Sequence, residues 1–251
     1  MIKEKSNSER FLAIYNEIDT YMRKKLSLSD GVAHSELIRK LIDKGNSLIR
    51  RYSDDLKAYA KLRNAIVHNP YKNQIDPIAE PHDIIIIKYQ KIRDEILNPP
   101  LALDILAVKA EKIYKIGLNY NAIEVMEEMN KQAFSYVPVI EKDTLIGVFS
   151  EKSIFSYIVK NKNVLIDDEC KISDFLEFIP LDNHCNECFL FKSRTITVVE
   201  IEEVFKNNLI GNKRIAIIFI TEKGKENEKI LGLITPWDVV TSNVNKIVNS
   251  F

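Results

Sequence analysis

The sequence has few cysteines, no long apolar run and no excess of basic residues, which are the features of disulfide-rich, membrane-spanning and strongly nucleic-acid-binding proteins, respectively. Its 251 residues include three cysteines, an odd number that argues against a disulfide framework. No apolar run approaches the roughly 18 to 20 residues of a membrane helix, and the longest runs, at 84–87 and 215–220, fit core elements. Lys and Arg together number 36, as do Asp and Glu, so the net charge is zero. A tight, general nucleic-acid binder would carry a basic excess, and any RNA contact should therefore be local.

The composition is that of an ordinary water-soluble protein. Hydrophobic residues make up 45% and charged residues 29%, a usual globular balance, and the length suits one large domain or two small ones. The first five residues, MIKEK, contain no apolar signal region. We therefore expect a cytoplasmic protein without a membrane segment.

The first hundred residues are expected to be helical. Ser6-Asn7-Ser8-Glu9 has the pattern of a capping box, and apolar residues recur at helical spacing after it. Four helices are predicted, near residues 6–26, 35–44, 53–68 and 83–97. The isoleucines at 84–87 would suit a strand by propensity, but apolar residues from 85 to 96 keep the helical period.

Asn98-Pro99-Pro100 ends the last of these helices. We place a domain boundary there, between an all-α domain at 1–98 and a second domain at 103–245.

The second domain contains an internal repeat. Its first copy is predicted as a helix at 122–131, two strands at 136–140 and 145–150, and a helix. Its second copy is predicted as a helix at 199–207, two strands at 214–220 and 230–235, and a last helix. The copies lie about 80 residues apart, with a longer polar turn between the strands of the second, as expected where loops tolerate insertions.

The second copy carries a candidate phosphate and sugar site at the start of its last helix. Thr235 fits the N-cap and Pro236 the first helical position. Free backbone N–H groups at a helix start favour phosphate, the Thr235 hydroxyl can add a bond, and the Asp238 carboxylate can accept from both hydroxyls of a ribose. The alternative is that this is a common helix start, in which Asp238 only satisfies an N–H.

This half resembles a tandem pair of CBS domains. The resemblance rests on the two glycine turns, on the strand at 137–139, and on Thr235 together with Asp238. The resemblance implies an α+β fold of two βαββα repeats, at about 103–165 and 166–245. It further implies binding of an adenosine nucleotide such as AMP, ADP or ATP as a regulatory ligand.

The CBS resemblance also implies which residues hold the ligand. Thr235 would contact the phosphate, Asp238 the ribose, and the backbone around Ile196 and Ile215 the adenine. In the first copy Ser150 keeps the hydroxyl, but Ser153 stands where the ribose acid belongs, and a serine makes only one weaker bond to a diol. We therefore expect one good site per chain.

The segment from Arg63 to His68, RNAIVH, suits cleavage of a phosphodiester. An arginine binds phosphate with a planar fork of donors, and a histidine moves protons near neutral pH. Arg63 and His68 lie about 140° apart around a helix, so one helix makes a poor pocket. Two copies across a two-fold axis could form one groove.

Arg63, Asn64 and His68 resemble the motif of the HEPN superfamily, helical bundles that dimerise and often cut RNA. The resemblance implies that Arg63 stabilises the scissile phosphate and that His68 assists proton transfer for attack by the 2′-hydroxyl. It implies a homodimer that needs no metal or other cofactor for catalysis. The alternative is that these residues only build a dimer interface or cap a helix.

Together these features predict a nucleotide sensor whose CBS pair regulates a dimeric, HEPN-type ribonuclease acting on RNA. The rival hypothesis is a non-enzymatic adaptor, in which the helical domain dimerises or binds a partner.

Other features carry weaker signals. The segment 36–63 has eight basic residues against four acids, which fits either a local RNA contact or a solvated helix face. Cys185 and Cys188 are one pair where structural zinc usually needs two, so no metal site is predicted.

Three ring residues are expected to be structural. His34 and His82 flank predicted helix starts and are expected to be caps or surface residues. Trp237 is expected to pack under the last helix rather than to stack on a base.

Overall fold

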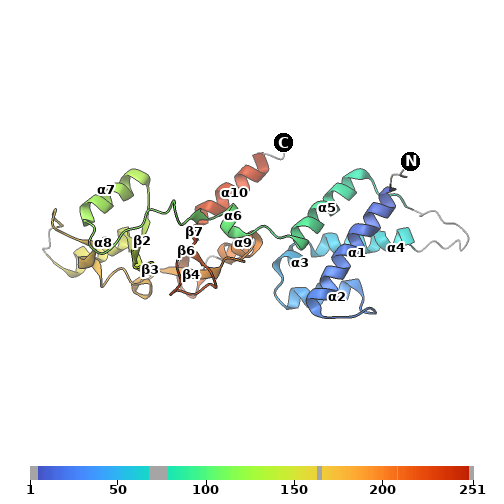
Figure 1. The fold of residues 1–251 in the computed structure, drawn as a ribbon, viewed down its shortest axis with the longest axis horizontal. Helices are drawn as coiled ribbons and strands as arrows, with labels where there is room; N and C mark the ends of the chain where they lie inside the picture. Colours follow the sequence, from blue (N-terminus) through green and yellow to red (C-terminus); the bar gives the residue numbers. More distant parts are fainter. Residues whose placement is uncertain (1–4, 68–78, 163–165, 208, 249–251) are drawn as a thin grey trace, which may run out of the picture. The chain divides into compact units, whose positions relative to one another are not determined.

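A computed structural model describes residues 5–67, 79–162, 166–207 and 209–248, with backbone only from 243 onward. The chain divides into two compact units, Met1–Pro100 and Leu101–Phe251, which are labelled by element in Figure 1.

The first unit consists of helices. They are α1 (Asn7–Leu26), α2 (His34–Asp43), α3 (Ser47–Arg51), α4 (Ser53–Val67) and α5 (Asp83–Leu97). The predicted capping box is confirmed, because the Ser6 side chain accepts from the Glu9 N–H and the Glu9 carboxylate accepts from the Ser6 N–H at 2.9 Å. The short helix α3 was not predicted; Gly45-Asn46 does end α2, but the Asn46 side chain then caps α3.

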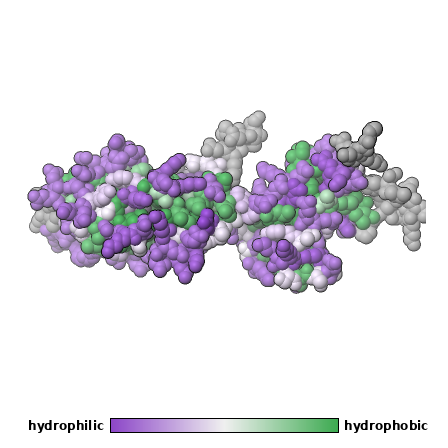
Figure 2. All heavy atoms as spheres, in the orientation of Figure 1, coloured by the Kyte–Doolittle hydropathy of each residue, from purple (hydrophilic) through white to green (hydrophobic). Residues whose placement is uncertain are grey.

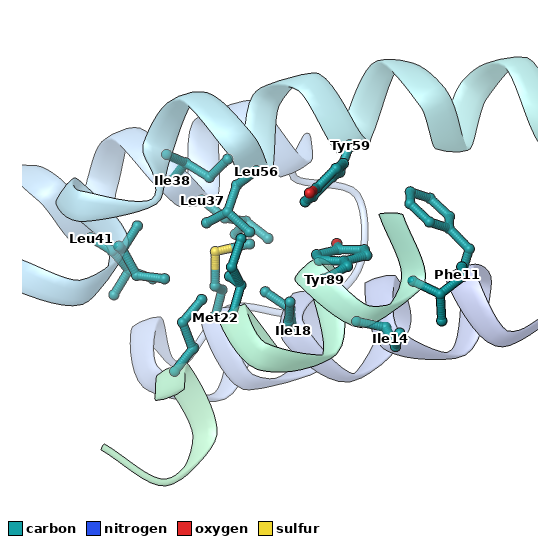
Figure 3. Close-up of a cluster of buried hydrophobic side chains, with 14 of the residues drawn as sticks. Phe11, Ile14, Ile18, Met22, Leu37, Ile38, Leu41, Leu56, Tyr59 and Tyr89 are labelled. Atoms are coloured by element: carbon teal, nitrogen blue, oxygen red, sulfur yellow. The ribbon is translucent and has the colours of Figure 1, made fainter. Parts of the chain in front are cut away.

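Three aromatic rings lie at the centre of this unit's core. Phe11 of α1, Tyr59 of α4 and Tyr89 of α5 have ring centroids 4.3 to 5.9 Å apart, and Figure 3 shows aliphatic side chains packed around them. The prediction of a helix rather than a strand at 83–97 is confirmed. Helical geometry explains the isoleucine run, since Ile86 is buried while Ile87 is 57% exposed.

The second unit combines two sheets with helices. The five-stranded sheet has the order β1 (Val108–Lys109), β7 (Gly232–Ile234), β6 (Lys213–Thr221), β4 (Glu187–Ser193), with β5 (Leu209–Ile210) also paired to β6. The two-stranded sheet is β2 (Tyr136–Glu141) with β3 (Thr144–Ser150). The helices are α6 (Ala102–Ile105), α7 (Ala122–Gln132), α8 (Glu151–Lys160), α9 (Val198–Asn207) and α10 (Pro236–Val248), with 3₁₀ turns at Ile172–Phe175 and Leu181–Asn183.

The repeat is visible in the pairing of these strands. In each copy a helix leads into an antiparallel hairpin, β2–β3 in the first and β6–β7 in the second. In each copy a segment before the helix pairs parallel to the first hairpin strand: Ile116 bridges Val139, and β4 pairs along β6. The hairpin β2–β3 turns tightly through Lys142 and Asp143, both at positive φ, whereas the second copy has the longer loop.

The two repeated glycines allow close backbone contacts. A Cβ on Gly147 would lie 2.1 Å from the Ile179 carbonyl oxygen, and one on Gly232 would lie 3.0 Å from the Val108 carbonyl oxygen. The β3 backbone therefore fits against 179 only without a side chain at 147.

Gly147→Ala should lower the free energy of unfolding by about 3 kcal/mol or more, because backbone atoms on both sides must shift. Gly232→Ala should cost less, about 1 kcal/mol, because its closest contact is longer. Urea unfolding of both variants measures the difference. Equal losses would show that the Gly147 contact is not the cause.

The predicted α+β class is confirmed, with a helical unit preceding a mixed unit. Within the described residues, no helix is long and apolar enough to span a bilayer.

Candidate functional site

The second unit contains a cavity of about 600 Å³. Residues of the first copy and of β6, β7 and α10 line it together. Among them are two cations, Lys112 and Arg214, four aromatic residues, Tyr114, Phe134, Tyr136 and Trp237, and the predicted pair Thr235 and Asp238. The volume lies within the range of small-molecule sites.

Thr235 and Asp238 lie together at one wall of this cavity, where β7 ends and α10 begins. The Asp238 Oδ2 accepts from the Thr235 backbone N–H and from the Thr235 hydroxyl, each at 2.7 Å. Both side chains are half-buried. Among the described residues, the Asp238 Oδ1 accepts no hydrogen bond that the structure records, so it is available to a ligand.

The same capping geometry occurs at α9, outside the cavity. There Glu200 accepts from the Thr197 N–H and hydroxyl, each at 2.8 Å. The bonds between Thr235 and Asp238 are therefore those of an ordinary helix start, and the position of this pair on a cavity wall is what distinguishes it.

Trp237 is not packed under the last helix, and that prediction was wrong. Its side chain is 76% exposed and lines the cavity. Trp237 is the second residue of α10, and Val239, two positions later, supplies the buried contact with the core instead.

Ile196 and Ile215, the two residues predicted beside the adenine, do not themselves line this cavity. The Ile196 N–H donates to the Ser193 carbonyl at 3.0 Å, and its own carbonyl accepts from Ala102 at 2.9 Å. Ile215 points into a core cluster, and its neighbours on β6, Arg214 and Ala216, line the cavity instead.

Ser150 of the first copy is 1% exposed. Its hydroxyl caps α8 by accepting from the Ser153 N–H at 3.2 Å and bonds the Ser153 hydroxyl at 3.1 Å. Ser150 is therefore buried inside the first copy and does not line the cavity described above.

A buried polar cluster lies directly behind the cavity wall. The Glu187 carboxylate accepts from the Tyr136 hydroxyl at 2.9 Å and pairs with His184 Nδ1 at 3.2 Å, while Arg214 Nη2 lies 3.8 Å away. The His184 and Tyr136 hydrogen bonds lower the pKa of Glu187 despite its burial. Burial and the Glu187 carboxylate raise the pKa of Tyr136 to about 12.

This cluster was not predicted from the sequence. The aromatic run after Cys188 is a strand signal that could have placed Glu187 at the start of β4. Its partner Tyr136 lies 51 positions earlier, and no local pattern predicts that pairing.

In the helical unit, Arg63 and Asn64 lie near the end of α4, and His68 lies outside the described residues. The Arg63 guanidinium carbon is 5.6 Å from the centre of the Tyr15 ring, and its Nη1 donates to the Asn64 side chain at 3.3 Å. Asn64 is exposed. Arg63 is thus held against α1.

His34 is buried rather than a surface residue or cap, so that prediction was wrong. Its ring stacks on Tyr15 at 4.4 Å, and its Nδ1 pairs with Asp19 at 2.8 Å. Asp19 also accepts from Arg23 at 2.6 Å. Burial lowers the pKa of His34, and the hydrogen bond with Asp19 opposes this only partly.

The lowered pKa of His34 predicts that the helical unit loses stability in acid. The folded state binds its proton less readily than the unfolded state, so this contribution is complete above about pH 6.5 and is lost as the pH falls through the folded pKa. Amide exchange protection of α1 and α2, measured from pH 7.5 to 5, should fall less in His34→Phe than in the wild type. The same pH dependence in both proteins would contradict this assignment.

The basic residues of 36–63 are partly paired on the surface. Arg39 contacts Glu36 at 2.6 Å and Asp43 at 3.0 Å, and Lys57 lies 3.6 Å from Asp54. These contacts favour a solvated helix face over an RNA surface.

Cys185 is exposed and Cys188 half-buried, both with free thiols. Over the described ranges, no group of three or more His, Cys, Asp or Glu residues is placed to hold a metal ion.

Residues 108–160 match the family model of the CBS domain, and this segment is a CBS domain. No curated protein matches the chain. Similar solved structures include CBSX2 in complex with AMP, at 12% identity and a TM-score of 0.41, over 59% of this chain and 98% of that one. CbpB in complex with c-di-AMP is 19% identical with a TM-score of 0.44, over 64% and 94%. A CBS domain protein from Streptococcus pneumoniae TIGR4 is 12% identical with a TM-score of 0.45, over 66% and 94%.

Proposed function

We propose that residues 103–245 form a tandem CBS pair that binds one adenosine nucleotide as a regulatory ligand. The observation that carries this function is the joint position of Thr235 and Asp238 on the wall of a cavity of about 600 Å³. AMP, ADP and ATP share the adenosine that such a site would recognise.

Each wall of the cavity suits one part of a nucleotide. The start of α10 and the Thr235 hydroxyl favour a phosphate. Asp238 can accept from a ribose hydroxyl through its Oδ1, because both capping bonds use Oδ2. The adenine would lie against apolar residues such as Ile113, Pro138 and Ile217. Of the two predicted adenine contacts, the backbone around Ile215 reaches this cavity through Arg214 and Ala216, whereas Ile196 does not line it.

We further propose that the helical unit is a HEPN-type domain that cuts RNA as a homodimer without metal. Arg63 and Asn64 lie near the end of α4, and His68 follows in sequence. Tyr15 supports Arg63 with its ring, and a guanidinium held in place loses less freedom when it binds phosphate. His68 would supply the proton transfer.

A non-enzymatic adaptor is the second candidate, favoured by apolar residues on the surface of the helical unit. Ile84 and Ile87 of α5 are 55% and 57% exposed, and Val67 of α4 is 44% exposed. Such residues suit contact with a protein partner. In that case Arg63 would be a structural residue of the bundle.

Exposed apolar side chains on the second unit support a homodimer. Phe155, Ile158 and Val159 of α8 are 48% to 67% exposed, and Val240 of α10 is 51% exposed. Figure 2 shows hydrophobic residues reaching a mainly hydrophilic surface.

One experiment separates the two candidates. The purified chain is incubated with mixed RNA and EDTA, with and without ATP or AMP, while calorimetry measures nucleotide binding. Cleavage that depends on nucleotide supports a regulated ribonuclease. Nucleotide binding without cleavage under any condition supports the adaptor. If the chain neither binds nucleotide nor cleaves RNA, the regulatory site is refuted as well.

A further inference from the structure

Arg214 lies between the cavity and a buried carboxylate. It is the second residue of β6, its side chain is 66% exposed, and it lines the cavity. Its Nη2 is 3.8 Å from Oε1 of Glu187, whose side chain is 7% exposed. The guanidinium is therefore attracted to Glu187 across a distance longer than a hydrogen bond.

Glu187 is already bonded to other groups. Its Oε1 accepts from the Tyr136 hydroxyl at 2.9 Å, and its Oε2 pairs with His184 Nδ1 at 3.2 Å. These bonds fix the carboxylate behind the wall and satisfy it without Arg214. Arg214 can leave Glu187 without stranding a buried charge that has no partner.

We propose that Glu187 competes with the ligand for Arg214. Without ligand, Glu187 attracts the guanidinium of Arg214, and in the complex a phosphate group of the ligand binds this guanidinium instead. Arg214 is then the residue that distinguishes phosphorylated ligands from the bare nucleoside. This inference rests on the proposed nucleotide site and adds a role to two residues outside the Thr235 and Asp238 pair.

The physical reason is a difference in geometry and charge. A phosphate in the cavity can accept two parallel hydrogen bonds from the planar guanidinium, whereas Glu187 offers only a loose contact at 3.8 Å. A phosphate dianion also carries more charge than a carboxylate. The exchange therefore favours the ligand, with Glu187 reducing its net affinity.

Calorimetric titrations of adenosine, AMP and ATP into the full chain test this exchange. Arg214→Gln should weaken ATP and AMP binding about tenfold or more and leave adenosine unchanged. Glu187→Gln should tighten both nucleotides roughly two- to fivefold, because glutamine still accepts from Tyr136 but no longer attracts Arg214. In the double variant the Glu187→Gln effect should vanish. Lys213→Gln is the matched control, since it removes the adjacent cation, which does not line the cavity.

Equal weakening of adenosine and nucleotides by Arg214→Gln would overturn the role of Arg214. Competition between Glu187 and the ligand would be overturned if a folded Glu187→Gln protein bound nucleotides no more tightly than the wild type. It would also be overturned if Glu187→Gln raised the nucleotide affinity by the same factor in the double variant. If Glu187→Gln does not fold, crystal structures of the wild type with and without ATP decide the matter. Arg214 should leave Glu187 for a phosphate, and Arg214 unmoved beside Glu187 would overturn the exchange. Absence of adenine nucleotide binding in the wild type would instead refute the proposed function itself.

Discussion

Asp238→Ala should reduce the affinity for AMP, ADP and ATP by about 10- to 100-fold. A carboxylate that accepts hydrogen bonds from a ribose contributes on the order of 1.5 to 3 kcal/mol per bond, and each 1.4 kcal/mol is about tenfold in affinity. The substitution also removes the two bonds that Asp238 makes with Thr235. Calorimetry with the full chain measures the loss directly.

Glu200→Ala is the matched control for this substitution. Glu200 makes the same two bonds with Thr197 at the start of α9, but neither residue lines the cavity. Both variants should lose about 1 kcal/mol of stability from the lost cap, and only Asp238→Ala should lose the nucleotide. Unchanged affinity in Asp238→Ala would move the site elsewhere and leave Asp238 as a capping residue.

His68→Ala should lower the rate of RNA cleavage by about 100- to 10,000-fold, the range that general acid–base catalysis supplies. The expected mechanism uses the 2′-hydroxyl of the RNA as nucleophile, so the loss should be the same with EDTA present. Cleavage of a labelled RNA by the wild type and the variant, with nucleotide at saturation, gives the ratio of rates.

His82→Ala is the control for this second substitution. His82 is exposed at the N-cap of α5 and makes no capping bond with its side chain, so its removal should leave cleavage unchanged. Equal activity of His68→Ala and the wild type would show that His68 takes no part in the chemistry. A contaminating nuclease would be unaffected by either substitution.

Local patterns were sufficient for most helices and hairpins. The capping box at Ser6 and the helical period after Asp83 act through neighbours close in sequence. The glycines at 147 and 232 could be recognised as a repeat, but the contacts that require them come from residues far away in the chain. The helix α3 was missed because it has only five residues, too few for a period. The strand β4 was not predicted, although the residues after Cys188 are a local strand signal. Its parallel pairing with β6, which lies more than 20 positions later, has no local signal.

For the candidate site, too, local sequence predicts one part, and the other part depends on the packing of distant segments. Thr235 and Asp238 are three residues apart on one helix start, so the sequence alone could propose them. Whether that start lines a cavity depends on how β6, β7 and the first copy pack together. The backbone of Ile196 was expected to contact the adenine, but its N–H and its carbonyl form hydrogen bonds within the fold.

By itself, the sequence determined the α+β class and the repeat, and it proposed the Thr235–Asp238 pair as a candidate site, because periodicity, caps and turns are properties of adjacent residues. Only the tertiary structure decided that His34 is buried against Asp19, that Trp237 faces the cavity, and that Glu187 stands behind Arg214. Burial and electrostatic partners come from residues far apart in the chain, and a side chain's chemistry depends on which of them packing brings within a few ångströms.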